Sequence, residues 1–205
     1  MGRIIYENRL SNHFSKNQNE GNESQAIMNQ NQFDSQRIVV LHGDVNEHTI
    51  SLVVGQMLYL ASVNHKPIHL VVSTYGGSVD EMFTLYDTIK FLPCPVQTIA
   101  LGKVMSAGVL LLASGEKGKR LIGRSARIMM HPVSGGSVGN IFEVHHELTE
   151  HNRLHNLMID ALARESKMPR ENILEIMKTG HDMYYTADDA IKFGIVDKIV
   201  GDDRK

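Results

Sequence analysis

The chain has 205 residues, 42% of them hydrophobic, which is enough for one ordinary domain with a sizeable core. Lys and Arg number 21 against 23 Asp and Glu, so the formal net charge of −2 indicates neither nucleic acid nor an anionic membrane as a partner. The single cysteine, Cys94, excludes an internal disulfide and is typical of a reducing compartment, and no apolar run reaches transmembrane length.

The first 35 residues differ from the rest of the chain. They are rich in Asn, Gln, Ser and Glu and offer little apolar surface to bury, so we expect a polar segment that is disordered or forms a loop. From residue 36 the composition becomes that of a globular domain, which we expect to run to residue 201. Residues 202–205 form a short C-terminal tail.

The central region alternates apolar strands with amphipathic helices. We expect strands at 37–41, 68–73 and 96–101, and helices at 47–61 and from 79 to just before Pro93. Asn46, Ser78 and Thr186 are each placed to cap a helix. For the helix at 47–61 the apolar face is predicted to comprise Ile50, Val53, Val54, Met57, Leu58 and Ala61.

The second half continues the alternation. A short apolar helix follows Ser106, strands are expected at 120–122, 126–130, 183–185 and 195–200, and helices at about 140–166, 169–178 and 186–193. The long helix has an apolar stripe of Ile141, Val144, Leu148, Leu154, Leu157, Met158 and Ala161. This order predicts an α/β fold, a mostly parallel sheet covered by helices, with repeating units in the manner of a stacked ββα spiral.

Three features lie where predicted strands end. Gly76-Gly77 follows one strand, Ser106 lies at a strand-to-helix corner, and His131 ends another strand before Pro132. Ligand sites of parallel sheets gather at the carboxyl ends of strands, so these residues are candidates for one site. Taken singly, each has a simpler interpretation: a strand-ending turn, a helix N-cap and a structural histidine.

Several motifs together resemble one family. Residues 73–79, 86–89, 105–108, 113–120 and 128–132 resemble ClpP, the proteolytic subunit of the Clp protease, over about residues 36–201. The resemblance implies the ClpP/crotonase-like fold with a protruding handle helix at about 140–166. It also implies an ATP-dependent serine endopeptidase that needs no cofactor and no metal, because ATP is used by a partner.

The resemblance assigns roles to individual residues. It implies that Ser106 is the nucleophile, His131 its general base and Asp182 the carboxylate that orients His131. Gly77 and Ala107 are implied as oxyanion-hole donors. The substrate-binding residues implied are Gly76, Gly135, Gly136 and Ser137, which pair with an extended peptide through the backbone.

The resemblance also implies an assembly. Members form seven-membered rings, usually stacked as a tetradecamer, and an AAA+ unfoldase of the Clp type feeds protein and peptide substrates into the chamber. The segment 1–35 occupies the position of the axial loops. No nucleic acid or membrane partner is expected, and the location expected is the cytoplasm, or the plastid stroma or an infected host's cytoplasm.

Alternatives stay open at this point. One is a crotonase-like acyl-CoA enzyme, which needs oxyanion donors but no serine nucleophile, and another is a ring subunit with a regulatory role. On the long helix, His151 and His155 have the spacing of a metal-binding pair, although nothing completes a tetrahedral set. A further hypothesis is that protonation of the helix histidines, which include His145 and His146, loosens ring contacts below pH about 6.5.

Overall fold

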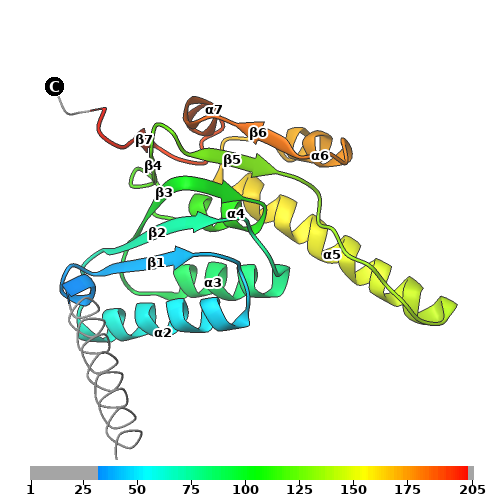
Figure 1. Ribbon diagram of the computed structural model, residues 1–205, viewed down its shortest axis with the longest axis horizontal. Helices are drawn as coiled ribbons and strands as arrows, with labels where there is room; N and C mark the ends of the chain where they lie inside the picture. The colour runs from blue at the N-terminus through cyan, green and yellow to red at the C-terminus, as the bar shows by residue number, and fades with distance from the viewer. Residues whose placement is uncertain (1–31, 203–205) are drawn as a thin grey trace, which may run out of the picture. The chain divides into compact units, whose positions relative to one another are not determined.

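The computed structural model describes residues 32–202 (Figure 1). The chain divides into two compact units, residues 1–38 and 39–205. Of the first unit, residues 32–35 are helical. The expectations for residues 1–31 and 203–205 fall outside the described residues.

One sheet organises the second unit. Among the described residues, β1 (Ile38–His42), β2 (Ile68–Thr74), β3 (Val96–Met105), β4 (Leu121–Ile122) and β7 (Lys198–Ile199) lie side by side in that order. β5 (Arg127–Met130) pairs with β3, and β6 (Met183–Tyr185) pairs antiparallel with β5. The pairs β2–β3, β3–β4, β3–β5 and β4–β7 are all parallel, as the alternation of strands and helices predicts.

Most of the helices pack close to the sheet, whereas one long helix extends away from it. α2 (Glu47–Val63), α3 (Val79–Phe91) and α4 (Ala107–Ala113) pack in succession, and α4 contacts β2 and β3. α5 (Ile141–Glu165) extends away from the sheet (Figure 1), and α6 (Arg170–Lys178) packs against α5. The last helix is α7 (Ala187–Lys192). The three predicted caps are confirmed, because Asn46, Ser78 and Thr186 each accept a hydrogen bond from a first-turn N–H.

β3 is longer than predicted because it passes through a bend and continues to residue 105. Gly102, at φ +71°, lies at the bend, where the register against β2 shifts between Val72 and Thr74. Before the bend β3 pairs with β4, and after it with β5. Because of the bend, β3 pairs with both β4 and β5, and it ends at Met105, directly before Ser106.

Three sequence predictions are wrong, two of them about packing and one about the length of a strand. On α2, Leu58 is exposed and Leu60 is buried, so the inward face is rotated relative to the predicted one. On α5, only the C-terminal half carries the buried residues, and Ile141 and Leu148 are exposed, since that end extends beyond the sheet. The last strand is shorter than predicted and spans Lys198–Ile199.

None of the helices in residues 32–202 combines the length and the apolar character needed to cross a bilayer.

Candidate active site

Ser106 occupies a strained corner between β3 and α4. Its backbone has φ 54° and ψ −123°, a left-handed conformation that costs a non-glycine residue about 1–3 kcal/mol. Its N–H donates to the Met129 carbonyl at 2.8 Å, and every residue of α4 is buried. The side chain makes no capping hydrogen bond, so the N-cap interpretation is wrong.

Gly76 allows a second segment to approach this corner closely. A Cβ on Gly76 would lie 2.6 Å from the Ser106 Cβ and 2.9 Å from the Met105 carbonyl oxygen. The Gly76 N–H donates to the hydroxyl of Thr74, which is fully buried, at 2.9 Å. Only a glycine fits between Thr74 and the serine. Thr74 was missed by the sequence reasoning, although a lone hydroxyl in a buried strand just before two glycines is a usable signal.

Gly77 is held on its other side by Val45. The Val45 N–H donates to the Gly76 carbonyl and the Ser78 N–H donates to the Val45 carbonyl, both at 2.8 Å. In this parallel bridge the N–H of Gly77 points away from Val45. Gly77 and Ala107 both line the hollow next to Ser106. The Ala107 N–H opens α4 and so has no partner within that helix.

His131 is brought to Ser106 by the pairing of β3 with β5. That register sets Met105 opposite Met129, so the two residues that follow the strands meet at the same sheet edge. His131 Nε2 and Ser106 Oγ are 2.7 Å apart. With Nε2 unprotonated, the serine hydroxyl donates to the imidazole, which is the contact that activates a hydroxyl nucleophile.

Asp182 lies near the histidine in register but does not bond to it. β5 and β6 pair Met130 with Met183, and continuing the register sets His131 opposite Asp182. In the part of the chain that the structure describes, the exposed carboxylate accepts a hydrogen bond of 3.4 Å from the Tyr184 hydroxyl and none from His131. The structure brings together two of the three residues predicted for catalysis.

The predicted substrate-binding residues after His131 lie along α5. The Gly135 backbone packs on a histidine ring, since a Cβ there would lie 2.9 Å from His151 Cε1, whereas Gly136 faces open space. The Ser137 hydroxyl oxygen is buried without a hydrogen-bond partner. His155 accepts a 3.4 Å hydrogen bond from the Val133 N–H. Sequence reasoning noted the spacing of the two histidines but not their contact with this segment.

A small hollow of about 50 Å³ lies beside the serine and histidine. Besides residues already described, its walls are Val79, Met82, Val133, Ser134 and Met158. Most of these walls are apolar, so the hollow suits an uncharged side chain next to the reacting atoms.

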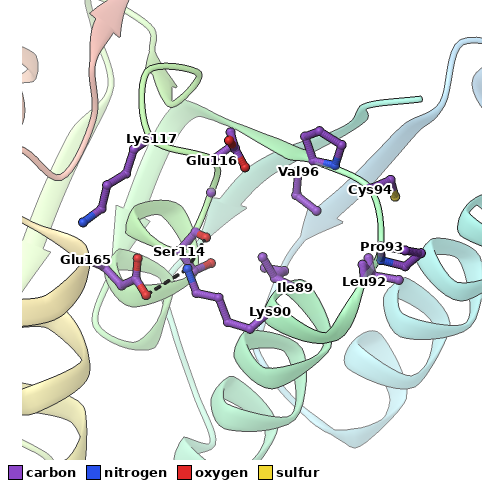
Figure 2. A pocket seen from close by; sticks show the side chains of 12 residues that line it. Ile89, Lys90, Leu92, Pro93, Cys94, Val96, Ser114, Glu116, Lys117 and Glu165 are labelled. Atoms are coloured by element: carbon purple, nitrogen blue, oxygen red, sulfur yellow. Dashed lines mark hydrogen bonds and ion pairs between the residues drawn. The ribbon is translucent and has the colours of Figure 1, made fainter. Parts of the chain in front are cut away.

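A larger cavity lies elsewhere, between the ends of α3 and α5 and the start of β3 (Figure 2). It measures about 540 Å³ and contains none of the predicted site residues. At its edge the Lys90 ammonium is 2.8 Å from the Glu165 carboxylate, which also accepts a hydrogen bond from the Tyr86 hydroxyl. Burial and the Glu165 carboxylate raise the pKa of Tyr86, which keeps the phenol protonated and donating. These bonds join α3 to α5.

No group of three His, Cys, Asp or Glu side chains with metal-binding geometry occurs in residues 32–202. His151 and His155 instead contact the segment that follows His131.

An α/β fold with a serine and a histidine in hydrogen-bond contact at the strand ends has the arrangement of a serine hydrolase. The family model described as Clp protease matches residues 19–203. The chain therefore belongs to the Clp protease family, has the ClpP/crotonase-like α/β fold, and is a serine peptidase of the ClpP type. Membership implies oligomeric assembly and partners of the Clp type.

Proposed function

We propose that the chain is the subunit of a ring-shaped, chambered endopeptidase in which Ser106, His131 and Asp182 form the catalytic triad. Ser106 Oγ attacks the peptide carbonyl carbon while its proton moves to His131 Nε2. The imidazolium then gives this proton to the departing amine, and water hydrolyses the acyl-enzyme by the reverse roles. Asp182 holds the imidazole in the required tautomer once it bonds to Nδ1.

The N–H groups of Gly77 and Ala107 are the proposed oxyanion donors. Support comes from their place in the hollow beside Ser106 and from the orientation of the Gly77 N–H away from Val45. Donors already fixed in the folded backbone need no rearrangement when the tetrahedral intermediate forms.

Substrate is proposed to bind as an extended strand along Gly76, Gly135, Gly136 and Ser137. Backbone hydrogen bonds distinguish little between substrate side chains, so we expect many unfolded proteins and peptides to be accepted as substrates. The unpartnered Ser137 hydroxyl is consistent with a segment that acquires a polar partner on binding.

The proposed assembly is a ring of seven, stacked as a tetradecamer and fed by an ATP-using AAA+ unfoldase. Support comes from exposed apolar side chains at the free end of α5: Val138, Ile141, Phe142 and Leu148. An uncovered apolar surface of this kind is typical of a protein contact. The domain at 36–201 forms the ring body, the segment 1–35 lies at the axial pore, and residues 202–205 are a tail. We place the assembly in the cytoplasm, or in the plastid stroma or an infected host's cytoplasm, and the single cysteine of the sequence supports a reducing compartment.

The 2.7 Å contact between Ser106 and His131 carries this proposal, and covalent labelling tests it. A fluorophosphonate probe is expected to label wild-type protein at Ser106. The Ser106→Ala variant should not be labelled, and its rate of peptide cleavage should fall at least about 10⁴-fold. The native mass of both proteins gives the number of subunits in the assembly and shows whether the variant still assembles. Cleavage by Ser106→Ala at the wild-type rate, or a label on another residue, would refute the role of the serine.

The same probe separates the endopeptidase from a crotonase-like acyl-CoA enzyme. Such an enzyme uses oxyanion donors without a serine nucleophile and would take no label at Ser106. A regulatory ring subunit would assemble without cleaving peptide.

A further inference from the structure

We propose that His155 is a positioning residue that holds the segment 133–137 in place for substrate, and that its protonation releases this segment. The inference rests on the proposed endopeptidase function, in which the segment pairs with substrate. It goes beyond that function by assigning a role to a side chain on α5 that lies outside the proposed triad.

Two histidines, one helical turn apart on α5, hold the segment. The Val133 N–H donates to His155 Nδ1 at 3.4 Å, only two residues after His131. One turn earlier, the His151 ring packs against the Gly135 backbone, where a Cβ would lie 3.3 Å from Nδ1 and 2.9 Å from Cε1. The segment is therefore held at two points, one by a hydrogen bond and one by packing.

The hydrogen bond requires a neutral imidazole. A neutral ring with its proton on Nε2 accepts at Nδ1, whereas an imidazolium has two donors and no acceptor. Burial and the neighbouring Arg170 guanidinium lower the pKa of His155. The bond with Val133 is therefore present at neutral pH and lost in acid.

The charged and titratable groups around His155 are few. Arg170 on α6 lies nearby, with its Nε 2.6 Å from the Asp160 carboxylate and its Nη2 2.8 Å from the side-chain oxygen Oδ1 of Asn156. His151 lies one turn away on α5. Residues 132–139 carry no charged side chain, so His131 is the titratable group on that side. With Arg170 close by, a charge on His155 has a repelling neighbour, and the Val133 N–H would face a second donor.

Release of the segment changes substrate binding more than chemistry. Val133 and Ser134 line the hollow beside Ser106, so their displacement alters where the peptide lies. The Ser106–His131 contact depends on β3 and β5 rather than on the segment. Loss of one positioning hydrogen bond, about 1 kcal/mol, corresponds to roughly a fivefold increase in KM with little change in kcat.

Three variants of the assembled protein test this role through kcat and KM between pH 8 and 5.5. Wild-type KM should rise as the pH falls. His155→Gln keeps an acceptor that does not titrate, so this rise in KM should disappear. His155→Leu has no acceptor, so KM should be raised about fivefold at every pH. His65→Gln, a change of an exposed histidine in the connection between α2 and β2, is the matched control and should follow wild type. A His155→Gln profile identical to wild type, or a wild-type KM for His155→Leu, would overturn the proposal.

Hydrogen exchange at one pH gives a readout that does not depend on activity. Amides of residues 133–137 should exchange faster in His155→Leu than in wild type or His65→Gln. An unchanged rate in His155→Leu also overturns the proposal. Failure of the endopeptidase function would appear differently, as wild-type protein that shows no Ser106-dependent cleavage while the exchange difference is present.

Discussion

The two sides of the candidate site are built differently. On the serine side, residues 74–77 and the corner at Ser106 are fixed by a fully buried α4, a buried Thr74 and backbone bonds to Val45 and Met129. On the acid side, Asp182 is exposed, and its carboxylate accepts a 3.4 Å hydrogen bond from the Tyr184 hydroxyl.

This difference separates what the single chain determines from what it leaves open. Core packing fixes the position of Ser106, its contact with His131 and the N–H groups of Gly77 and Ala107, and such packing resists small shifts. Within the described residues nothing fixes the Asp182 carboxylate toward His131. The register of β5 and β6 sets His131 opposite Asp182, so the proposed triad requires a rearrangement that turns the Asp182 carboxylate toward His131. Contacts made on assembly are a natural source of that rearrangement.

The largest expected effect comes from removing the charge of Asp182. Asp182→Asn should lower kcat roughly 10⁴-fold, because the amide favours the wrong histidine tautomer. Tyr184→Phe is the matched control: it removes the hydroxyl that now bonds to Asp182, and it should preserve or raise activity. Peptide cleavage by the assembled protein measures both. Normal cleavage by Asp182→Asn would mean that the acid side takes no part in catalysis.

A smaller effect is expected from one methyl group on the serine side. Gly77 has φ +148°, and a Cβ there would collide with the Val45 carbonyl oxygen. Gly77→Ala should therefore lower the free energy of unfolding by about 2–4 kcal/mol. Gly136→Ala, where the added methyl meets open space, should change it by less than about 0.5 kcal/mol. Urea denaturation measures both, and equal stabilities would show that the serine side tolerates a methyl group as well as the open position at Gly136 does.

The smallest effect concerns the cap of α7, just after β6 on the acid side. Hydrogen bonds from the Thr186 hydroxyl and N–H lower the pKa of Asp189, so the carboxylate stabilises the fold above the ordinary aspartate pKa of about 3.9. That contribution is lost as the pH falls through the lowered pKa, because the unfolded chain takes up the proton first. Asp189→Ala should cost about 1 kcal/mol at pH 7 and less below pH 4. A cost that does not depend on pH would assign the effect to helix propensity instead.

Local rules predicted the elements, and long-range contacts decided the rest. Periodicity and caps were sufficient for the strands, helices and the α/β class, since these depend on neighbouring residues. Leu58 and Leu60 are both apolar and only two residues apart, so periodicity did not distinguish which one faces the core. The sequence predicted one apolar stripe along α5, but no local pattern shows that, in the described structure, Ile141 and Leu148 at its N-terminal half are exposed.

The same division applies to the site. The family motifs located Ser106, His131, Gly76 and Gly77, because each motif includes the strand end that positions it. The distance between His131 and Asp182 depends on the pairing of β5 and β6, which no motif encodes. The contact of His155 with Val133 depends on how α5 packs against the preceding loop and follows from no sequence spacing.

The left-handed backbone of Ser106 also bears on how the family can change by mutation. A glycine at this position would relax the corner and make the fold more heat-resistant, yet it would remove the reactive hydroxyl. Selection for heat resistance alone would therefore act against this residue. A serine held in a conformation that disfavours it is what the proposed nucleophile role requires, since only the hydroxyl offsets the cost of this backbone.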